Sequence, residues 1–573
     1  MAANKITRHF VSIENGRWGS RQVHYRHVGS GPLVVLFHQS PLSSQDMIAT
    51  MEKWKKHFTC IAPDTPGYGL SDPFGVSHLE MSDIAQAAVE FFDAMGIERT
   101  AVYGFHTGAM IATALALHYP QRIVAAVANG YVVLTDQERE DIVENYLPPF
   151  EPKWDGSHLT WLWSRMREQT IFFPWYKKTL ADRLDFNVPS PEALQAGLVD
   201  FLRSGDAHRT GYRAAFTMRS DAALEKVTVP LLVTVSKFDA LASSMPRIKH
   251  KAKCVTTEVS GTMDETIEFS RKYLARHKLT TAPAPPPTAP LRGRMWNEFI
   301  AIPAGQLRVR RNDDAGGRPV IVQHDAAGSS EVVNDLARGF IGHRPVIAID
   351  LPGHGESDNT LLPGRVDVPA YAKAVLAALK TLGVAEFDFV GTWGGGLVGL
   401  ELAKLAPKRL QHLVLADMLY FSKVLRAQLR AHYTPDIQPK WYGGHLLEAW
   451  HLMRDQGLFW PWYNRTREGI IRKPQFIDPV MIHRRVIELF KSKGMWRRAY
   501  QAHFAYPLQQ QLREAKVPML FVAPSWDPQL EVTQQAARDF PQVPFKLMPD
   551  DMSRWAAELL PFYETEQLHR GMK

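Results

Sequence analysis

The chain has little cysteine. Among its 573 residues only Cys60 and Cys254 occur, and neither has a C-x-x-C partner or a nearby histidine pair. Structural zinc sites and disulfide frameworks need several cysteines at short, regular spacings. The sequence therefore predicts two reduced, structural thiols and no metal.

Long apolar runs are also absent. No run approaches the roughly 20 apolar residues that a membrane-spanning helix requires. The first residues, "MAANKITRHFVSIENG", lack the apolar core of a secretory signal. We expect a cytoplasmic location and no membrane partner.

The basic residues form no arm or cluster, although the net charge is +8 and the pI about 9.2. Lysine and arginine are spread along the chain among 59 acidic residues, so a nucleic-acid partner is not expected. The sequence also lacks a G-x-G-x-x-G motif and a P-loop, and we expect no cofactor.

One segment does stand out in composition. "LTTAPAPPPTAPLRGR" (279–294) holds five prolines and almost no apolar bulk, which favours an extended spacer over a packed element. The sequence thus predicts a linker at 279–292 between domains 1–278 and 293–573.

The two halves repeat each other. "CIAPDTPGYGLSDP" (60–73) matches "VIAIDLPGHGESDN" (346–359), and "VYGFHTGA" (102–109) matches "FVGTWGGG" (389–396). The offset is 286 residues from Asp64 to Asp350 and 287 from His106 to Trp393. Such steady spacing indicates duplication of a whole domain.

Each half alternates short β-branched runs with amphipathic stretches. Runs of the first kind are Leu33–Phe37, Thr100–Tyr103 and Pro230–Val235, and stretches of the second kind are 83–95 and 109–119. This alternation is typical of a mostly parallel sheet covered by helices. Regions near 140–220 and 425–510 are rich in Trp, Phe, Tyr and Arg and predict an inserted helical cap in each half.

These motifs resemble the α/β-hydrolase fold. H-x-x-P follows one strand, D-x-P-G-x-G-x-S-D follows the next, G-x-x-x-G marks a strand-to-helix elbow, and a later strand ends near an aspartate. The resemblance covers both halves and implies two tandem α/β-hydrolase-like domains. It implies no single reaction, because the fold hosts many chemistries.

The resemblance implies a nucleophile at the elbow, an acid after a later strand and a histidine after the last strand. The elbow residue here is His106 in the first half and Trp393 in the second, and the acid positions hold Asp239 and Asp527. Thr262 and Met263 stand where the late histidine is expected, and the second half has only Asp550 and Asp551 there. Neither half holds a complete triad.

We expect His106 to act as a general base with Asp239 orienting its ring. The helix N-terminus behind the elbow favours a neutral imidazole, and Asp239 would oppose that effect. The resemblance implies oxyanion donors at Thr107 and near Gln39. Two alternatives stay open: a covalent route through Ser40 or Thr107, and a dead site in which His106 only fills space. Trp393 cannot usefully transfer protons, so the second half is expected to be non-catalytic.

The cap segments match most closely. Residues 152–176 and 439–463 are identical at 14 of 25 positions, His158 and Trp163 among them. Such a segment either binds a ligand or packs the cap and joins the halves, and we favour packing. For a substrate site the candidates are His38, His158, Trp163, Arg167, Trp175 and Tyr176, although His38 repeats as His324, which favours a structural role.

Arg165, Arg167 and Arg219 in an aromatic cap would suit an apolar or aromatic molecule with a carboxylate or carbonyl. The sequence therefore favours a cofactor-independent hydrolase or lyase that acts on an ester, lactone or carbon–carbon bond in the first domain. The alternative is a ligand-binding or scaffold protein without turnover. A small molecule is the expected partner, and a homo-oligomer is left open.

Overall fold

The structure, a computed structural model, describes residues 5–185, 187–473 and 477–570, so the ends of the predicted domains at 1–4 and 571–573 lie outside it. The chain folds into two compact units. Unit 1 comprises Met1–Glu151, His158–Ala289 and Trp441–Gly443, and unit 2 comprises Pro152–Ser157, Pro290–Lys440 and Gly444–Lys573.

The proline-rich segment stays with unit 1 as far as Ala289. The backbone N–H of Leu33 donates to the Thr280 carbonyl at 2.8 Å, and the Ser12 hydroxyl donates to the Ala289 carbonyl at 2.5 Å. Prolines lack an N–H donor but keep their neighbours' carbonyls available, so an extended proline-rich strand can still be held along a sheet edge. Much of the predicted linker is therefore bound to unit 1.

Within the described residues each unit contains one sheet of eight strands. The order in unit 1 is β1-β2-β4-β3-β5-β6-β7-β8, and unit 2 repeats it as β9-β10-β12-β11-β13-β14-β15-β16. The strands of unit 1 are β1 (Thr7–Gly16), β2 (Gly19–Val28), β3 (Leu33–Phe37), β4 (Thr59–Pro63), β5 (Thr100–Phe105), β6 (Ile123–Asn129), β7 (Leu231–Ser236) and β8 (Val255–Ser260). Those of unit 2 are β9 (Trp296–Ile302), β10 (Gly305–Asn312), β11 (Val320–Gln323), β12 (Val346–Ile349), β13 (Phe387–Thr392), β14 (Leu410–Ala416), β15 (Met519–Pro524) and β16 (Phe545–Met548).

In both sheets the first two strands are antiparallel and the remaining six run parallel. β1 pairs antiparallel with β2 and β2 antiparallel with β4, whereas β3, β4, β5, β6, β7 and β8 pair in parallel. Unit 2 repeats this pairing. This is the sheet of the α/β-hydrolase fold, so the fold class expected from the sequence is confirmed for both halves.

Helices cover both faces of each sheet. Unit 1 has α1 (Ile48–Trp54), α2 (Met81–Ala94), α3 (Thr107–His118), α4 (Asp136–Asn145), α5 (Ser157–Gln169), α6 (Pro191–Ser204), α7 (His208–Thr217), α8 (Ser220–Lys226) and α9 (Met263–Leu274), with 3-10 turns η2 (Ser44–Met47), η3 (Pro120–Arg122), η4 (Gly205–Ala207) and η5 (Ala242–Arg247). Unit 2 has α10 (Asn334–Arg338), α11 (Val368–Thr381), α12 (Gly394–Leu405), α13 (Lys423–His432), α14 (Gly444–Gln456), α15 (Pro479–Lys491), α16 (Met495–Ala505), α17 (Leu508–Glu514), α18 (Leu530–Asp539) and α19 (Trp555–Arg570), with η6 (Arg467–Gly469) and η7 (Met552–Arg554).

Successive side chains of β3 pack on opposite faces of the sheet. Val35 and Phe37 face one side and pack with α2 and α3, while Val34 and Leu36 face the other side and pack with α1 and α9. A strand buried on both faces has apolar side chains at successive positions, as this one does. The runs predicted at Leu33–Phe37 and 83–95 correspond to β3 and α2.

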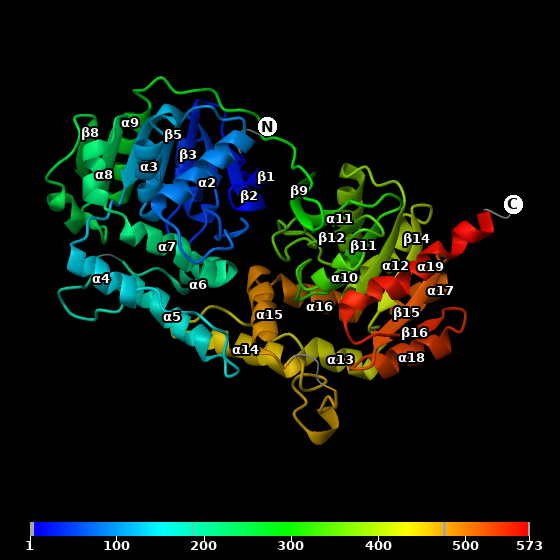
Figure 1. Ribbon diagram of the computed structural model, residues 1–573. Helices are drawn as coiled ribbons and strands as arrows, with labels where there is room; N and C mark the ends of the chain where they lie inside the picture. The colour runs from blue at the N-terminus through cyan, green and yellow to red at the C-terminus, as the bar shows by residue number, and fades with distance from the viewer. Residues whose placement is uncertain (1–4, 186, 474–476, 571–573) are drawn as a thin grey trace. The chain divides into compact units, whose positions relative to one another are not determined.

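The predicted cap of unit 1 consists of helices, with no named strand among its described residues. Figure 1 shows α4, α5, α6 and α7 grouped at one end of the unit 1 sheet, after β6 and before β7. In unit 2 helices α13 to α17 occupy the same place in the chain, between β14 and β15. The described chain between these pairs of strands, where the sequence predicts the caps, thus contains helices.

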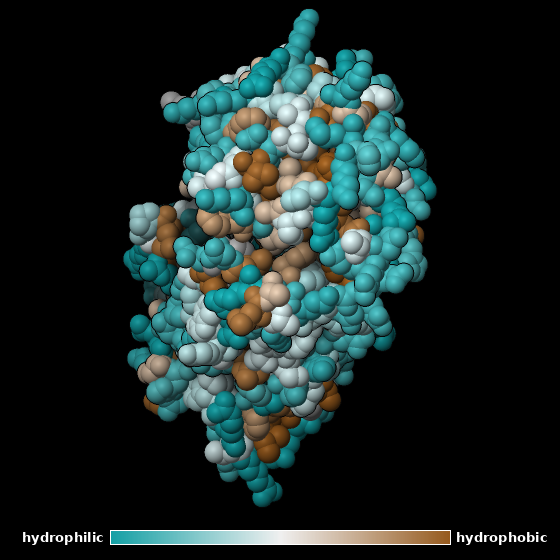
Figure 2. Space-filling view, turned by 90° about the vertical axis from the view of Figure 1, so that its left-hand side faces the viewer, coloured by the Kyte–Doolittle hydropathy of each residue, from teal (hydrophilic) through white to brown (hydrophobic). Residues whose placement is uncertain are grey.

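On the face shown in Figure 2, hydrophobic residues come through in patches between hydrophilic ones, as is usual for a protein surface. Among the described residues, none of the helices has the length and apolar character needed to cross a bilayer.

Candidate functional site

The elbow of unit 1 is the sharp turn between β5 and α3. His106 has φ 49° and ψ −108°, a backbone conformation that costs energy for any residue with a side chain. A Cβ on Gly104 would lie 1.8 Å from the Gly108 carbonyl oxygen, so Gly104 lets β5 and α3 approach closely. The turn projects the His106 side chain away from the strand, with 25% of that side chain exposed.

The imidazole of His106 contacts the carboxylate of Asp239. Nε2 lies 3.0 Å from Oδ2 and 3.1 Å from Oδ1, and an ionised carboxylate can only accept, so Nε2 carries the proton. Asp239 follows β7 and also accepts from the Leu241 N–H at 2.8 Å. Among the described residues, Nδ1 of His106 has no hydrogen-bond partner. The expected His–Asp pair is thus formed, with Nδ1 left available for proton transfer.

The late-histidine position is used to cap a helix. Thr262 is the N-cap of α9, where its hydroxyl accepts from the Glu265 N–H at 3.2 Å. No residue there reaches between the elbow and the acid, which is why His106 can bond Asp239 directly. A glycine makes this possible: Gly130 has φ 72°, and a Cβ on it would lie 2.2 Å from Cδ2 of His106.

The electrostatics of His106 differ from the expectation of a neutral imidazole. Burial alone would lower its pKa, but the charge of Asp239, the hydrogen bond to Asp239 and the charge of Asp46 outweigh burial and raise the pKa above 6.5. For Asp239, burial would raise the pKa, and the interactions with His106 bring it below 3.8. The two carboxyl groups therefore stabilise the protonated form of His106 relative to a free imidazole.

Asp46 is a site residue that the sequence did not reveal. It lies in η2, eight residues beyond His38, and no motif marks it. Burial raises its pKa, although the Gln39 side chain donates to Oδ1 at 3.2 Å and lowers it. The charge of His106 thus interacts with two carboxyl groups whose pKa values shift in opposite directions, a pattern that can separate acid and base roles.

The predicted oxyanion donors meet different partners. Both the side chain and the backbone N–H of Gln39 are directed at Asp46, the latter at 3.5 Å. Thr107 is the first residue of α3, so the helix itself leaves its N–H unused. Its hydroxyl accepts from the Ser40 N–H at 3.3 Å, and Ser40 Oγ lies 2.7 Å from the Tyr68 hydroxyl. The Thr107 N–H thus remains a candidate oxyanion donor, whereas the N–H groups of Gln39 are directed at Asp46.

His38 connects two loops. Nδ1 lies 2.9 Å from the Gln39 carbonyl oxygen, and Nε2 accepts from the Thr65 N–H at 3.0 Å. In unit 2 His324 repeats both bonds, to Asp325 at 2.7 Å and from Leu351 at 2.9 Å. Both ring nitrogens are occupied by backbone groups, which fits the structural role and leaves none for a substrate.

The cap segment that matches between the two halves mostly makes packing contacts. In unit 1 the Trp163 indole donates to the Trp441 carbonyl at 2.8 Å, and the Arg167 guanidinium lies 5.4 Å from the Trp441 ring. Trp175 donates to the Tyr146 carbonyl at 3.1 Å, and the Tyr176 hydroxyl donates to Asp141 at 2.8 Å. His158 is buried, with its ring 5.7 Å from that of Phe150. These contacts support the packing alternative for Trp163, Trp175, Tyr176 and His158.

The elbow of unit 2 has the same backbone shape, but its side chain and its neighbouring N–H are both hydrogen-bonded. Trp393 has φ 45° and ψ −117°, and its indole donates to Asp527 Oδ2 at 3.2 Å. The Gly394 N–H, at the place of Thr107, donates to Asp325 Oδ1 at 3.1 Å. Asp325 also accepts from the Tyr500 hydroxyl at 2.9 Å. A buried carboxylate therefore occupies the position where an oxyanion would form.

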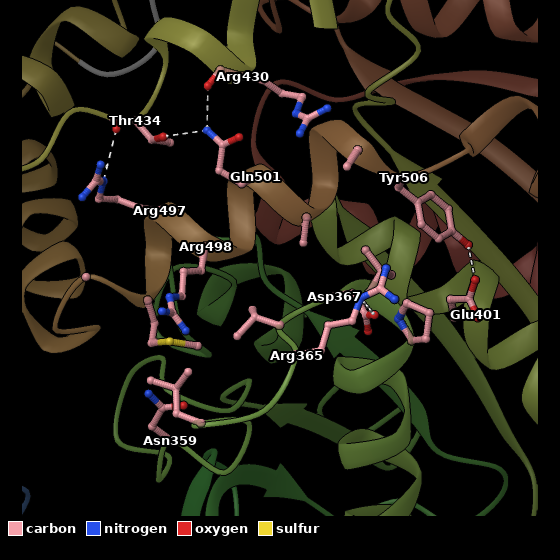
Figure 3. A pocket seen from close by; sticks show the side chains of 18 of the residues that line it. Asn359, Arg365, Asp367, Glu401, Arg430, Thr434, Arg497, Arg498, Gln501 and Tyr506 are labelled. Atoms are coloured by element: carbon pink, nitrogen blue, oxygen red, sulfur yellow. Dashed lines mark hydrogen bonds and ion pairs between the residues drawn. The ribbon is translucent and has the colours of Figure 1, made fainter. Parts of the chain in front are cut away.

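Two cavities of unit 2 differ in kind. A groove of about 1120 Å³ is lined by Arg430, Arg498 and other residues that do not include Trp393 or Asp527. Figure 3 shows Gln501 of this groove donating to the Arg430 carbonyl and to Thr434. A second cavity of about 70 Å³ is lined by Trp393 together with aromatic residues, and it is the one that reaches the elbow.

Within the part of the chain that the structure describes, no group of three or more His, Cys, Asp or Glu side chains is placed to hold a metal ion. Cys60 is buried and Cys254 partly buried, and both are free thiols.

Comparisons with known proteins agree with the fold. The family described as alpha/beta hydrolase fold matches residues 32–158 and 318–436, one region in each half. The chain is 39% identical over 119 residues to the dihydrolipoyllysine-residue acetyltransferase component of an acetoin cleaving system from Pseudomonas putida, covering 20% of this chain and 30% of that protein. It is 29% identical over 146 residues to 2-(acetamidomethylene)succinate hydrolase from Mesorhizobium japonicum, covering 25% and 51%.

Among solved structures, epoxide hydrolase I from potato shares 18% sequence identity with a TM-score of 0.38, covering 48% of this chain and 100% of that one. The chain spans about half or less of the length of the curated relatives named above. The family match in each half supports an alpha/beta hydrolase fold there and leaves the reaction open.

Proposed function

We propose that unit 1 is a cofactor-independent hydrolase or lyase that acts on a small apolar or aromatic carbonyl compound. The observation that carries this proposal is the bond between His106 Nε2 and Asp239 at a strained elbow, with Nδ1 left without a partner. A histidine held by a carboxylate through one nitrogen is a base at the other nitrogen.

In a hydrolysis, Nδ1 takes a proton from water while the water oxygen adds to the substrate carbonyl carbon. The resulting imidazolium is stabilised by Asp239, and the Thr107 N–H faces the oxygen on which negative charge develops. Collapse of the intermediate breaks the bond to the leaving group, which receives the proton from Nδ1. His106 ends neutral, and no serine takes part.

Unit 2 is proposed to be non-catalytic. Its elbow residue donates a hydrogen bond and cannot accept a proton, and its oxyanion position holds the Asp325 carboxylate. A negative charge fixed there would repel a developing oxyanion, so the second half is expected to add no turnover of its own.

A second candidate is a ligand-binding protein without turnover. The observation that favours it is the raised pKa of His106, because an imidazolium cannot accept a proton. The two curated relatives are named as an acetyltransferase component and as a hydrolase. The carbonyl chemistry proposed for this chain goes beyond what those names state.

The test is turnover of a panel of aryl esters, lactones and β-diketones by the full-length protein, with His106→Gln and Asp239→Asn as variants. General-base catalysis predicts a loss of roughly 10²- to 10⁴-fold in kcat for His106→Gln, and no acyl adduct by mass spectrometry during turnover. An adduct on Ser40 or Thr107 would replace this mechanism with a covalent one. If no compound is turned over while ligands bind to unit 1, the binding alternative takes its place.

A further inference from the structure

Arg165 is a buried cation without an anionic partner. It lies in α5 with 2% of its surface exposed, and its Nη1 donates to the Gln169 side chain at 3.1 Å. Among the described residues, no carboxylate pairs with the guanidinium, and Nη2 is buried without a hydrogen bond. A charge removed from water is costly unless a counter-ion accompanies it.

Aromatic side chains surround the guanidinium. Its carbon lies 5.7 Å from the Tyr146 ring, 5.3 Å from the Trp175 ring and 5.4 Å from the Phe201 ring. Such rings attract a cation only partly and supply no acceptor for Nη2. Burial lowers the pKa of Arg165, and the tyrosine hydroxyls oppose that shift. The surroundings thus fit an aromatic or apolar ligand with an anionic group that would pair with the guanidinium.

The internal repeat shows that cap packing does not need this arginine. The corresponding position in α14 of unit 2, 287 residues later, is Leu452, which is 2% exposed. Unit 2 instead has Arg485 in α15, where α6 of unit 1 has Gly197, 288 residues earlier. Arg485 Nη2 lies 3.3 Å from the side-chain oxygen of Gln456, which is the counterpart of Gln169.

In each half, one guanidinium therefore bonds the corresponding glutamine. The arginine lies in α5 in unit 1 and in α15 in unit 2. In unit 2 that guanidinium lines the cavity of about 70 Å³ together with Trp393, Tyr433 and Tyr500. The counterparts of Tyr433 and Tyr500 are Tyr146 and Tyr212, and the charge of Arg165 acts on both of these. Arg165 thus bonds the counterpart of Gln456, which in unit 2 lines the cavity that reaches the elbow.

A run of buried hydroxyls links the elbow of unit 1 to this place. Ser40 Oγ lies 2.7 Å from the Tyr68 hydroxyl, which donates to the His208 carbonyl at 2.8 Å in α7. On the same helix, the Tyr212 hydroxyl donates to the Tyr146 hydroxyl at 3.3 Å. Buried hydroxyls near the elbow and in the cap therefore meet at the same helix, α7.

We infer that Arg165 binds the carboxylate of the ligand of unit 1, with the Tyr146 and Phe201 rings holding the apolar part. This inference rests on the proposed function for the choice of site, and it assigns the ligand class as an aryl or alkyl carboxylate that carries the reactive carbonyl at its other end. A guanidinium presents two parallel N–H groups to a carboxylate, and Nη2 is the donor still unused.

Isothermal titration calorimetry of the full-length protein tests the inference without any turnover. The ligands are phenylacetate and its uncharged match phenylacetamide. Wild type is expected to bind phenylacetate roughly 10- to 100-fold more tightly than phenylacetamide, as for a hydrogen-bonded charge pair. Arg165→Leu, which installs the residue found in unit 2, is expected to lose that preference, and Arg165→Lys to keep part of it.

Arg213→Leu is the matched control, because it removes an exposed positive charge from α7 and is expected to leave binding unchanged. Equal affinity of wild type for the two ligands, or an unchanged preference in folded Arg165→Leu, overturns the inference; the comparison within wild type needs no variant to fold. If wild type prefers phenylacetate to phenylacetamide but turns over no compound of the ester panel, the carboxylate site is supported and the proposed reaction is contradicted.

Discussion

His106 combines a raised pKa with the proposed role of a base, and at the scale of single residues the two together set the pH at which it would act. A base must be neutral before it takes a proton, so kcat should rise with pH through a pKa above 6.5. Asp46 is one of the charges that raise this pKa. Asp46→Asn removes it and keeps a side chain that Gln39 can still bond.

The expected result of Asp46→Asn is a rising limb of kcat displaced to lower pH, measured from pH 5 to 9 with an ester that wild type turns over. The sign follows because the lost negative charge no longer stabilises the imidazolium. Glu52→Gln, which neutralises an acidic residue paired with Lys55 on α1, serves as the control and should leave the limb in place. A limb that stays put in Asp46→Asn would mean that Asp46 does not act on the His106 charge.

At the scale of elements, the two elbows separate shape from chemistry. Trp393→Phe removes the hydrogen bond to buried Asp527 and keeps an aromatic ring of smaller size. We expect the free energy of unfolding to fall by about 1–3 kcal/mol, since a buried acceptor loses a donor. Turnover should stay within about twofold of wild type, measured by urea denaturation and ester hydrolysis on the same samples.

His106→Gln is the counterpart at the other elbow, and it should show the opposite combination of lost turnover and nearly retained stability. A folded Trp393→Phe variant with abolished turnover would show that unit 2 takes part in the reaction.

At the scale of the whole molecule, each unit has its own sheet and its own buried core, so ionisations are expected to act on the unit that contains them. Burial raises the pKa of Asp527 from 3.8 to about 7, so the folded state binds a proton that the unfolded state has released. Stability is then lost as pH rises through this range. Asp527→Asn removes this ionisation.

The free energy of unfolding of wild type, relative to Asp527→Asn, should therefore decline between pH 4.5 and 8 in urea denaturation followed by tryptophan fluorescence. The slope with pH is the test, because the asparagine also changes the contact with Trp393 at every pH. Asp550→Asn, at an exposed position beside Ser525, is the control. Parallel slopes in wild type and Asp527→Asn would contradict the raised pKa.

The sequence predicted much of the fold and part of the site. The β-branched run Leu33–Phe37 and the matching motifs of the two halves were sufficient for both sheets, because a buried parallel strand needs little beyond local pattern and order. The partnership of His106 with Asp239 followed from the positions of elbow and acid in that order.

Other features depend on groups that meet only in three dimensions. Asp46 lies in a short turn without a motif, and its effect on His106 is a charge acting through space. Gln39 and Asp325 occupy corresponding positions in the two halves, yet one binds Asp46 and the other accepts from the Gly394 N–H. The raised pKa of His106 is a balance between burial and two carboxylates, and no local pattern encodes such a balance.

The elbow backbone is nearly identical in the two halves, with φ 49° at His106 and 45° at Trp393. The half proposed to lack turnover has therefore kept the strained turn since the duplication, because strand and helix can be joined at this spacing in few other ways. Surveys that search genomes for unrecognised enzymes by backbone strain at this turn would count this chain twice. The strained turn therefore reflects common ancestry. Whether the N–H of the next residue is free to bind a substrate is the better indicator of present activity.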